Sequence, residues 1–279
     1  RSEHVSLRDI TFEGNTGFPI FRNEPLERLR DLVDSITEPE YRITDEHPDY
    51  GGQKTRFKNN LEAIKMLHKL EEDGRNATPD EQTILARYVG WGGIPQAFDE
   101  NNGSWSNEYH QLKSMLSDEE YTAARASTLN AHYTSPTVIK AMYAALENMG
   151  FKKGNLLEPS CGTGNFFGLL PDSMDAQRYG VELDSITGRI AQQLYPSANI
   201  SVIGYENTSY PENYFGIAIG NVPFGGYGVA DKRYDKNKFS SHEYFFAKAL
   251  DQVRPGGIVA FITSKHMLDQ KNSSKRQYV

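Results

Sequence analysis

The sequence predicts an α/β fold in which a mainly parallel sheet carries helices on both faces. From about residue 132, short apolar runs alternate with segments of helical periodicity. The strand-like runs are NLLEPS, RYGVEL, NISVIGY, FGIAIGN and GGIVAFITS, and the helix-like segments are NFFGLLP, SITGRIAQQLY and HEYFFAKALDQV. Continuous apolar strands of this kind are typical of a sheet that is buried on both faces. Helical signals dominate the sequence before this point.

A mainly helical N-terminal extension is expected over residues 1–130, and the sheet domain over residues 131–279. TPDE (78–81) and SDEE (117–120) are capping boxes, in which side chains satisfy the first free N–H groups of a helix. The helix that begins at the first box should end at the glycines of GWGG (90–93). The tryptophan of that run is interpreted as a core anchor.

Composition places the chain among globular proteins. Of its 279 residues, 38% are hydrophobic and 24% are charged, which is ordinary for a packed domain. No apolar run approaches the roughly 20 residues that span a bilayer, and the polar start RSEHVSLRDI is unlike a signal peptide. The single cysteine, Cys161, fits a reducing compartment, so a cytoplasmic location is expected. Because the chain begins at Arg1 rather than Met, we expect it to be a piece of a longer protein.

The net charge of −7 argues against a basic surface that coats nucleic acid non-specifically. Local contact is still possible. DKRYDKNK (231–238) holds four basic residues that could meet phosphates, although a solvated loop is the commoner interpretation of such a run.

A glycine-rich turn joins a strand to a helix in LLEPSCGTGNFFG (156–168). Gly162 and Gly164 would let a ligand approach the backbone at the carboxyl end of the strand. A dinucleotide site is the rival interpretation, but its third glycine is displaced here, and Glu158 stands in the loop. A carboxylate would repel a pyrophosphate and attract the amino group or sulfonium of S-adenosylmethionine. The charge therefore favours the methyl donor.

Two further residues are predicted to belong to the same site as this loop. Glu182 ends the next strand about 20 residues on, where a carboxylate accepts hydrogen bonds from ribose hydroxyls; a solvent-facing strand end is the alternative. Cys161 is expected to line the pocket rather than to act as a nucleophile, because no histidine is evidently placed to activate it.

The run IGNVPFGGYG (219–228) closes the fourth strand next to this loop. An amino group conjugated to a purine is a poor nucleophile, and two acceptors aimed at its hydrogens would localise its lone pair. The side-chain oxygen of Asn221 and the carbonyl of Val222 can be these acceptors, and Pro223 biases Val222 toward an extended backbone. Phe224 offers a face for a base pulled out of its stack. A strand-ending turn with a buried phenylalanine is the alternative.

These motifs resemble the N6-adenine DNA methyltransferases of the amino-methyltransferase group in which donor binding precedes the catalytic motif. HYTSP resembles the group's leading donor-binding motif, EPSCGTG the first motif, GVELD the second, and NVPF the catalytic (D/N/S)-P-P-(Y/F). More closely, RYVGWGGIPQAFDE, STLNAHYTSP and GNVPFG resemble the methyltransferase domain of large methyltransferase–helicase fusion proteins of phages and conjugative elements. The similarity spans roughly residues 55–279.

The resemblance implies a Rossmann-like S-adenosylmethionine-dependent methyltransferase fold and a set of site residues. The catalytic residues would be Asn221, Val222, Pro223 and Phe224. The donor-binding residues would be Tyr133, Thr134, Pro136, Glu158, Pro159, Cys161, Gly162, Gly164, Glu182, Tyr205 and Glu206, and no metal is expected. Among them, Thr134 and Pro136 would line the methionine end of the donor, and Tyr205 or Glu206 its adenine.

The sequence departs from the family's pattern at three points. Gly216 stands where the family commonly has an acidic residue before the strand, a position that is usually structural. Val222 stands where the family has its first proline, although it still supplies the carbonyl. The fifth strand closes near Ser264, and the family's sheet normally adds a final two-stranded hairpin, so a C-terminally incomplete fold is expected. A target-recognition domain and helicase motifs are also expected to lie elsewhere.

The predicted function is transfer of a methyl group from S-adenosylmethionine to the N6 atom of a flipped-out adenine in double-stranded DNA, as part of restriction–modification. A helicase region of the same polypeptide is the expected partner, and no membrane is involved. Two alternatives stay open: a catalytically silent donor-binding scaffold, and a methyltransferase that acts on RNA or protein amines.

Overall fold

The computed structural model describes residues 39–45, 51–128, 134–223 and 228–264. The described residues from Glu40 onward belong to one compact unit of the chain. Tyr133 and Phe224, which the sequence analysis singled out, lie outside the described residues.

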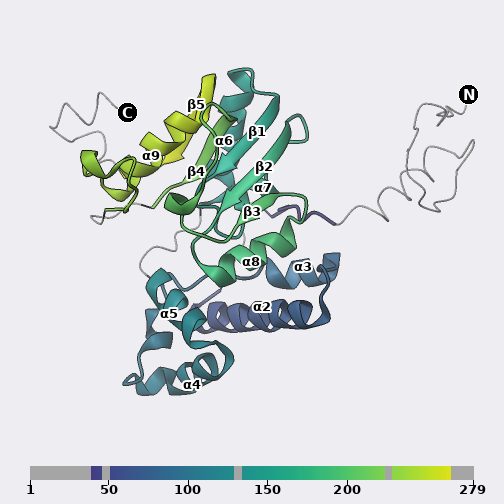
Figure 1. The fold of residues 1–279 in the computed structure, drawn as a ribbon. Helices are drawn as coiled ribbons and strands as arrows, with labels where there is room; N and C mark the ends of the chain where they lie inside the picture. Colours follow the sequence, from purple (N-terminus) through teal and green to yellow (C-terminus); the bar gives the residue numbers. More distant parts are fainter. Residues whose placement is uncertain (1–38, 46–50, 129–133, 224–227, 265–279) are drawn as a thin grey trace, which may run out of the picture. The chain divides into compact units, whose positions relative to one another are not determined.

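Five parallel strands form one sheet in the order β3-β2-β1-β4-β5 (Figure 1). The strands are β1 Lys153–Glu158, β2 Asp175–Val181, β3 Asn199–Ser201, β4 Phe215–Asn221 and β5 Val253–Ile262. The central strand β1 pairs with β2 on one side and with β4 on the other. This sheet confirms the predicted Rossmann-like α/β fold. It also brings the carboxyl ends of β2, β1 and β4 together, although they are far apart in the sequence.

Helices cover both faces of the sheet. They are α6 Pro136–Asn148, α7 Asn165–Gly168, α8 Ser185–Leu194 and α9 Ser241–Gln252, with short 3-10 turns at Tyr205–Asn207 and Asp235–Asn237. Leu156 and Leu157 are neighbours on β1, so their side chains point to opposite faces. Leu156 packs in a core with residues of α6 and α8, whereas Leu157 packs in a second core with residues of α9.

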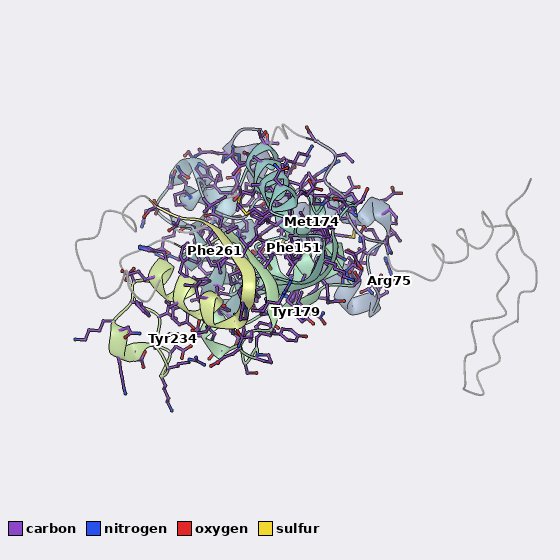
Figure 2. The ribbon with its side chains drawn as sticks, turned by 90° about the horizontal axis from the view of Figure 1, so that it is seen from above. Arg75, Phe151, Met174, Tyr179, Tyr234 and Phe261 are labelled. Atoms are coloured by element: carbon purple, nitrogen blue, oxygen red, sulfur yellow. The ribbon has the colours of Figure 1, made fainter. Side chains whose placement is uncertain are left out.

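Side chains fill both sides of the sheet (Figure 2). Of the residues labelled there, Phe151 and Met174 belong to the first core and Tyr234 to the second, against which Tyr179 and Phe261 pack. Both cores contain strand residues whose exposed fraction is close to zero, which agrees with the continuous apolar character of the strand sequences.

The segment before the sheet is helical where it is described. Its elements are α2 Gln53–Asp73, α3 Pro79–Leu85, α4 Ser106–Met115 and α5 Asp118–Ser127, with 3-10 turns at Pro95–Phe98 and Gly103–Trp105. Both predicted capping boxes are present, at Thr78 and at Ser117. None of the helices in the described ranges is long and apolar enough to cross a membrane.

The helix that begins at Pro79 ends at Leu85, earlier than the predicted end at the GWGG run. The side chain of Asn60 explains the difference, because it is fully buried and holds the backbone beyond the helix. Its Nδ2 donates to the carbonyl of Gly90 (2.6 Å), and its Oδ1 accepts from the N–H of Val89 (2.9 Å). These bonds fix a turn where a longer helix would have continued.

The helical segment packs directly on the sheet's helix α8. Gln82 of α3 donates from Nε2 to the carbonyl of Gln193 (3.0 Å), and Gln193 Oε1 accepts from the N–H of Ala77 (2.8 Å). Trp91, the expected core anchor, is fully buried and lies in the same continuous core as the first face of the sheet. The division of the chain into domains at residue 130 stays a prediction.

Candidate functional site

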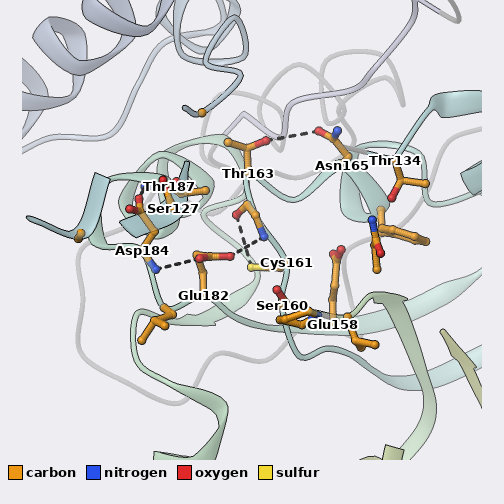
Figure 3. A pocket seen from close by; sticks show the side chains of 18 of the residues that line it. Ser127, Thr134, Glu158, Ser160, Cys161, Thr163, Asn165, Glu182, Asp184 and Thr187 are labelled. Carbon is orange, nitrogen blue, oxygen red and sulfur yellow. Dashed lines mark hydrogen bonds between the residues drawn. The ribbon is translucent and has the colours of Figure 1, made fainter. Parts of the chain in front are cut away.

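A pocket of about 290 Å³ opens at the carboxyl ends of β1, β2 and β4 (Figure 3). This volume is at the lower end of the roughly 300–1,000 Å³ that small-molecule sites enclose. Among the residues singled out from the sequence, those that line it are Thr134, Glu158, Cys161, Gly162, Glu182, Asn221, Val222 and Pro223. The glycine-rich loop and the run Asn221–Pro223 therefore share one pocket.

Five other predicted residues do not line this pocket in the described structure: Pro136, Pro159, Gly164, Tyr205 and Glu206. Pro136 is buried in the first turn of α6. Tyr205 is 2% exposed, and its hydroxyl donates to Gln252 Oε1 (2.6 Å) on α9. Pro136 and Tyr205 therefore make contacts within the protein, and their role toward the donor stays a prediction.

Glu182 locks the glycine-rich loop to the end of β2. Its Oε2 accepts from the N–H of Gly162 and its Oε1 from the N–H of Asp184, both at 2.8 Å (Figure 3). Burial raises the pKa of Glu182 to about 7, and these backbone hydrogen bonds oppose part of that rise. A carboxylate has about four acceptor sites, so Glu182 keeps capacity to accept from a ligand hydroxyl.

The two glycines of the loop have different roles. Gly162 has a φ of +55°, and a Cβ atom placed on it would meet no atom within 4 Å, so its surroundings are open. Gly164 has a φ of +84°, but a Cβ atom there would lie 2.5 Å from the ring of Tyr195. Gly164 is thus required for close packing at the start of α7, whereas Gly162 leaves room for a ligand.

Glu158 is a buried acid with its carboxyl directed into the pocket (Figure 3). It is 2% exposed, and its Oε2 atom accepts no hydrogen bond from the described residues. Burial, and then the negative charge of Glu182, raise its pKa well above the usual range of a glutamic acid. A Cβ atom on Gly220 of β4 would lie 3.3 Å from Glu158 Cγ, so the missing side chain makes room for this acid.

Hydrogen bonds on both sides hold the backbone of the run Asn221–Pro223. The N–H of Val222 donates to the carbonyl of Ile262 at the end of β5 (3.2 Å), and the side chain of Val222 is 1% exposed. A proline at this position would have no N–H to donate. On the other side, Ser241 Oγ at the start of α9 donates to the carbonyl of Pro223 (3.1 Å). The valine therefore replaces the rigidity of a proline ring with a hydrogen bond to the neighbouring strand.

Cys161 is part of the glycine-rich loop, and it is 4% exposed. Burial raises the pKa of its thiol well above the usual value, and the charges of Glu158 and Glu182 add to the rise. A thiol in such surroundings stays protonated at neutral pH, which disfavours nucleophilic chemistry. Within the described residues, no group of histidine, cysteine and acidic side chains could hold a metal ion.

The pocket also contains residues that sequence reasoning missed. Thr163, Asn165, Asp184 and Thr187 come from the loop and from the start of α8. Asp184 caps α8, since its Oδ1 accepts from the N–H of Thr187 (2.8 Å), and its place in the GVELD motif was the available signal. Residues of the helical segment line the pocket too. Gly90 and Ser127 lie in the runs RYVGWGGIPQAFDE and STLNAHYTSP, which carry part of the resemblance, whereas Ala123 and Ala126 lie in no quoted motif.

The basic run at 231–238 is partly committed to contacts within the chain. Arg233 forms ion pairs with Glu212 (2.7 Å) and Asp251 (2.9 Å). Lys232 and Lys236 are exposed. A contact of this run with phosphates stays a prediction.

Two curated proteins are similar in sequence to the chain, and no protein-family model matches it. Over 269 residues the chain is 26% identical to Defense against restriction protein B of Escherichia phage P1. The aligned region covers 92% of this chain and 10% of that protein. Over 152 residues it is 26% identical to Modification methylase CviBIII of Paramecium bursaria Chlorella virus NC1A. The aligned region covers 52% of this chain and 40% of that protein. The chain thus spans less than half the length of either relative.

Solved structures resemble the fold at low sequence identity. A putative class I S-adenosylmethionine-dependent methyltransferase from Listeria monocytogenes is 14% identical with a TM-score of 0.42, covering 79% of this chain and 77% of that one. A modification subunit of a putative type I restriction enzyme from Vibrio vulnificus YJ016 is 15% identical with a TM-score of 0.42. The match covers 71% of this chain and 45% of that one. In sequence, the chain is similar to a phage protein of defence against restriction and to a viral modification methylase, which confirms the predicted resemblance.

Proposed function

We propose that the chain is the donor-binding and catalytic part of an S-adenosylmethionine-dependent DNA methyltransferase that modifies the N6 atom of a flipped-out adenine. The observation that carries the proposal is the shared pocket, in which Glu158 and Glu182 lie with the run Asn221–Pro223. Similarity to a protein named as a modification methylase supports DNA as the substrate. The proposed partners are double-stranded DNA and a helicase region of the same polypeptide.

The pocket residues suit the methyl donor. S-adenosylmethionine carries positive charge on its sulfonium and amino groups, and Glu158 offers a buried carboxyl oxygen that has no partner among the described residues. Glu182 has free lone pairs at the place where a nucleoside's ribose hydroxyls are held in α/β folds of this type. The open space at Gly162 allows the ligand to lie against the backbone. We therefore assign Glu158 to the cationic end and Glu182 to the ribose.

When bound, S-adenosylmethionine supplies a methyl group on a positively charged sulfur that leaves as a neutral thioether. The chain's task is to orient the adenine amine and to keep its lone pair available. Asn221 Oδ1 and the carbonyl of Val222 would accept the two amine hydrogens, so that the lone pair points at the methyl carbon. The amine proton leaves to solvent after the nitrogen–carbon bond forms, and no general base is required.

The fixed backbone of the catalytic run supports this role. Acceptors that are held before the substrate arrives need no reorganisation during the reaction, which is the basis of electrostatic catalysis. The hydrogen bonds of Val222 to β5 and of Pro223 to α9 provide that rigidity. Phe224 is proposed to stack on the extruded base.

The experiment has two stages. Calorimetric titration of the chain with S-adenosylmethionine tests donor binding. Labelled donor is then supplied with double-stranded DNA, RNA and protein substrates, to this chain and to any longer polypeptide that contains it, and N6-methyladenine is measured by mass spectrometry. Binding without transfer to any substrate would support a scaffold instead. Transfer confined to RNA or protein would exclude DNA as the substrate.

A further inference from the structure

Part of the donor pocket is built by the helical segment that precedes the sheet. Gly90, Ala123, Ala126 and Ser127 line the pocket together with the residues of the sheet. We name these four residues the α5 wall, because three of them belong to α5. The wall carries no charged side chain. Its position depends on how α5 is held.

An ion-pair cluster clamps α5 onto α8. Glu120, Ala123 and Ser127 are spaced by three and four residues, so they share one face of α5. Glu120 Oε1 forms an ion pair with Arg189 Nη2 on α8. Arg189 Nη1 also bonds both carboxylate oxygens of Glu71 on α2, at 2.9 Å each. The face of α5 that holds the wall is thereby directed toward α8.

The first turn of α8 lies at the ribose end of the pocket. Asp184 caps this helix and donates its N–H to Glu182, the proposed ribose acceptor. Figure 3 shows Ser127 at the end of the pocket with Asp184, while Thr134 lies well separated toward the other end. The α5 wall therefore belongs to the nucleoside half of the pocket rather than to the methionine half.

The turn at Gly90 is rigid. Gly90 has a φ of +64°, in the left-handed region that favours glycine. The buried side chain of Asn60 holds this turn by donating to the carbonyl of Gly90. The neighbouring Trp91 makes ring contacts with Phe57 and Phe98. The GWGG run is thus a structural support for the pocket wall as well as a core anchor.

The chemistry of this end fits a base and its sugar. The alanine methyl groups of the wall and the 75% exposed side chain of Leu183 offer apolar contact to a flat ring. The Oδ2 atom of Asp184 is buried and accepts no hydrogen bond from the described residues, although Asp184 is 8% exposed and lines the pocket. A ligand hydroxyl or amino group would satisfy this oxygen.

We propose that the α5 wall covers the adenosine half of the methyl donor, so that the helical segment sets donor affinity together with the sheet. The proposal rests on the proposed function, because it assumes that this pocket takes S-adenosylmethionine. Small side chains are needed along the wall because larger ones would occupy the space of the nucleoside.

The test introduces leucine on the wall and measures two ligands. Ala126→Leu and Ala123→Leu are made in the full chain, with Thr122→Leu as the matched control on an exposed position of α5 outside the pocket. Each is titrated with S-adenosylmethionine and with 5′-methylthioadenosine, which keeps the nucleoside and lacks the amino-acid end. Thermal unfolding without ligand checks that each variant is folded. Ala126 is exposed, so this variant keeps the test valid even if Ala123→Leu fails to fold.

We expect the dissociation constants of both ligands to rise by about tenfold or more for the wall variants and to stay unchanged for Thr122→Leu. If the wild type binds the donor and the folded wall variants bind it equally tightly, the role proposed for the α5 wall is wrong and the proposed function stays intact. A loss for S-adenosylmethionine alone would place the wall at the methionine end and would also overturn the proposal. No donor binding by the wild-type chain would refute both proposals.

Discussion

Ser241 Oγ donates a 3.1 Å hydrogen bond to the carbonyl of Pro223, which ties the start of α9 to the run that follows β4. Ser241 is fully buried, whereas Pro223 is partly exposed. Val222 is tied in the same way to β5. The run Asn221–Pro223 is therefore held between two elements that come later in the chain.

Removing this tie should slow methyl transfer. For Ser241→Ala we expect the rate to fall by about 2- to 10-fold, the worth of one neutral hydrogen bond, with donor affinity unchanged. Single-turnover rates and donor titration separate the two effects. Ser240→Ala is the control, because it removes the N-cap of α9 without touching Pro223, and it should lower thermal stability instead. Equal rates in the wild type and Ser241→Ala would show that the tie has no catalytic role.

Asn221 should matter for transfer far more than for donor binding. Asn221→Ala removes an acceptor that acts mainly in the transition state, so a rate loss on the order of 100-fold is expected. The donor dissociation constant should change little. If the protein methylates adenine and the variant keeps its rate, the role assigned to Asn221 is wrong.

Glu182 should be a determinant of donor affinity. Glu182→Ala should weaken binding by about 1–3 kcal/mol, because ribose hydroxyls would be left unpaired in a largely buried site. Glu206→Gln is the comparison, since Glu206 does not line the pocket, and it should bind as the wild type does. Calorimetry on both folded variants provides the measurement. Similar losses in both would place Glu206 in the site as well.

Donor binding should strengthen as the pH rises. The pKa values of Glu158 and Glu182 are both raised in the donor-free protein, the second to about 7, so both acids hold protons to unusually high pH. A cationic ligand favours their ionised forms, and binding should therefore release protons. Titrations between pH 6 and 8 in buffers of different ionisation enthalpy measure this release. In Glu158→Gln the release should be smaller, and an unchanged value would exclude Glu158 as a source.

The same buried acid should lower the stability of the donor-free protein at neutral pH. The folded pKa of Glu158 lies above its unfolded value, so the folded state binds the proton more tightly and loses stability as the pH rises through this interval. Glu158→Gln removes the ionisation. We expect its free energy of unfolding at pH 8 to be about 1–3 kcal/mol higher than that of the wild type, with a smaller difference at pH 5. Urea denaturation at the two pH values provides the test.

Local signals in the sequence predicted the parts of the site that lie at strand ends. Glu158, Glu182 and Asn221 each follow an apolar strand, and the carboxyl ends of neighbouring parallel strands meet at one edge of the sheet. The strand order that makes β1 the neighbour of both β2 and β4 agrees with the predicted resemblance. Such features are readable because each depends on a short run of residues.

The contacts that the sequence did not predict join distant segments. The helix after Thr78 ends before a turn that Asn60 holds. The turn residues bound by Asn60 are Val89 and Gly90, which lie 29 and 30 residues after Asn60 in the sequence. Ala123 and Ala126 lie in no quoted motif, yet they line the pocket on α5, the helix whose Glu120 pairs with Arg189 of α8. The proximity of Gly164 to the ring of Tyr195, which leaves no room for a Cβ atom, is another such contact, and its predicted contact with the ligand stays a prediction. Side-chain contacts over such separations depend on the whole packed core, which no local pattern encodes.

The shared pocket has a consequence for how this region can pass between proteins during evolution. The residues that hold the methyl donor in our proposal come from both the helical segment and the sheet, and the two segments belong to one compact unit. A recombination event that transferred the sheet alone would deliver a site with one side missing. In our proposal, the helices and the sheet must therefore be transferred together for the site to be complete.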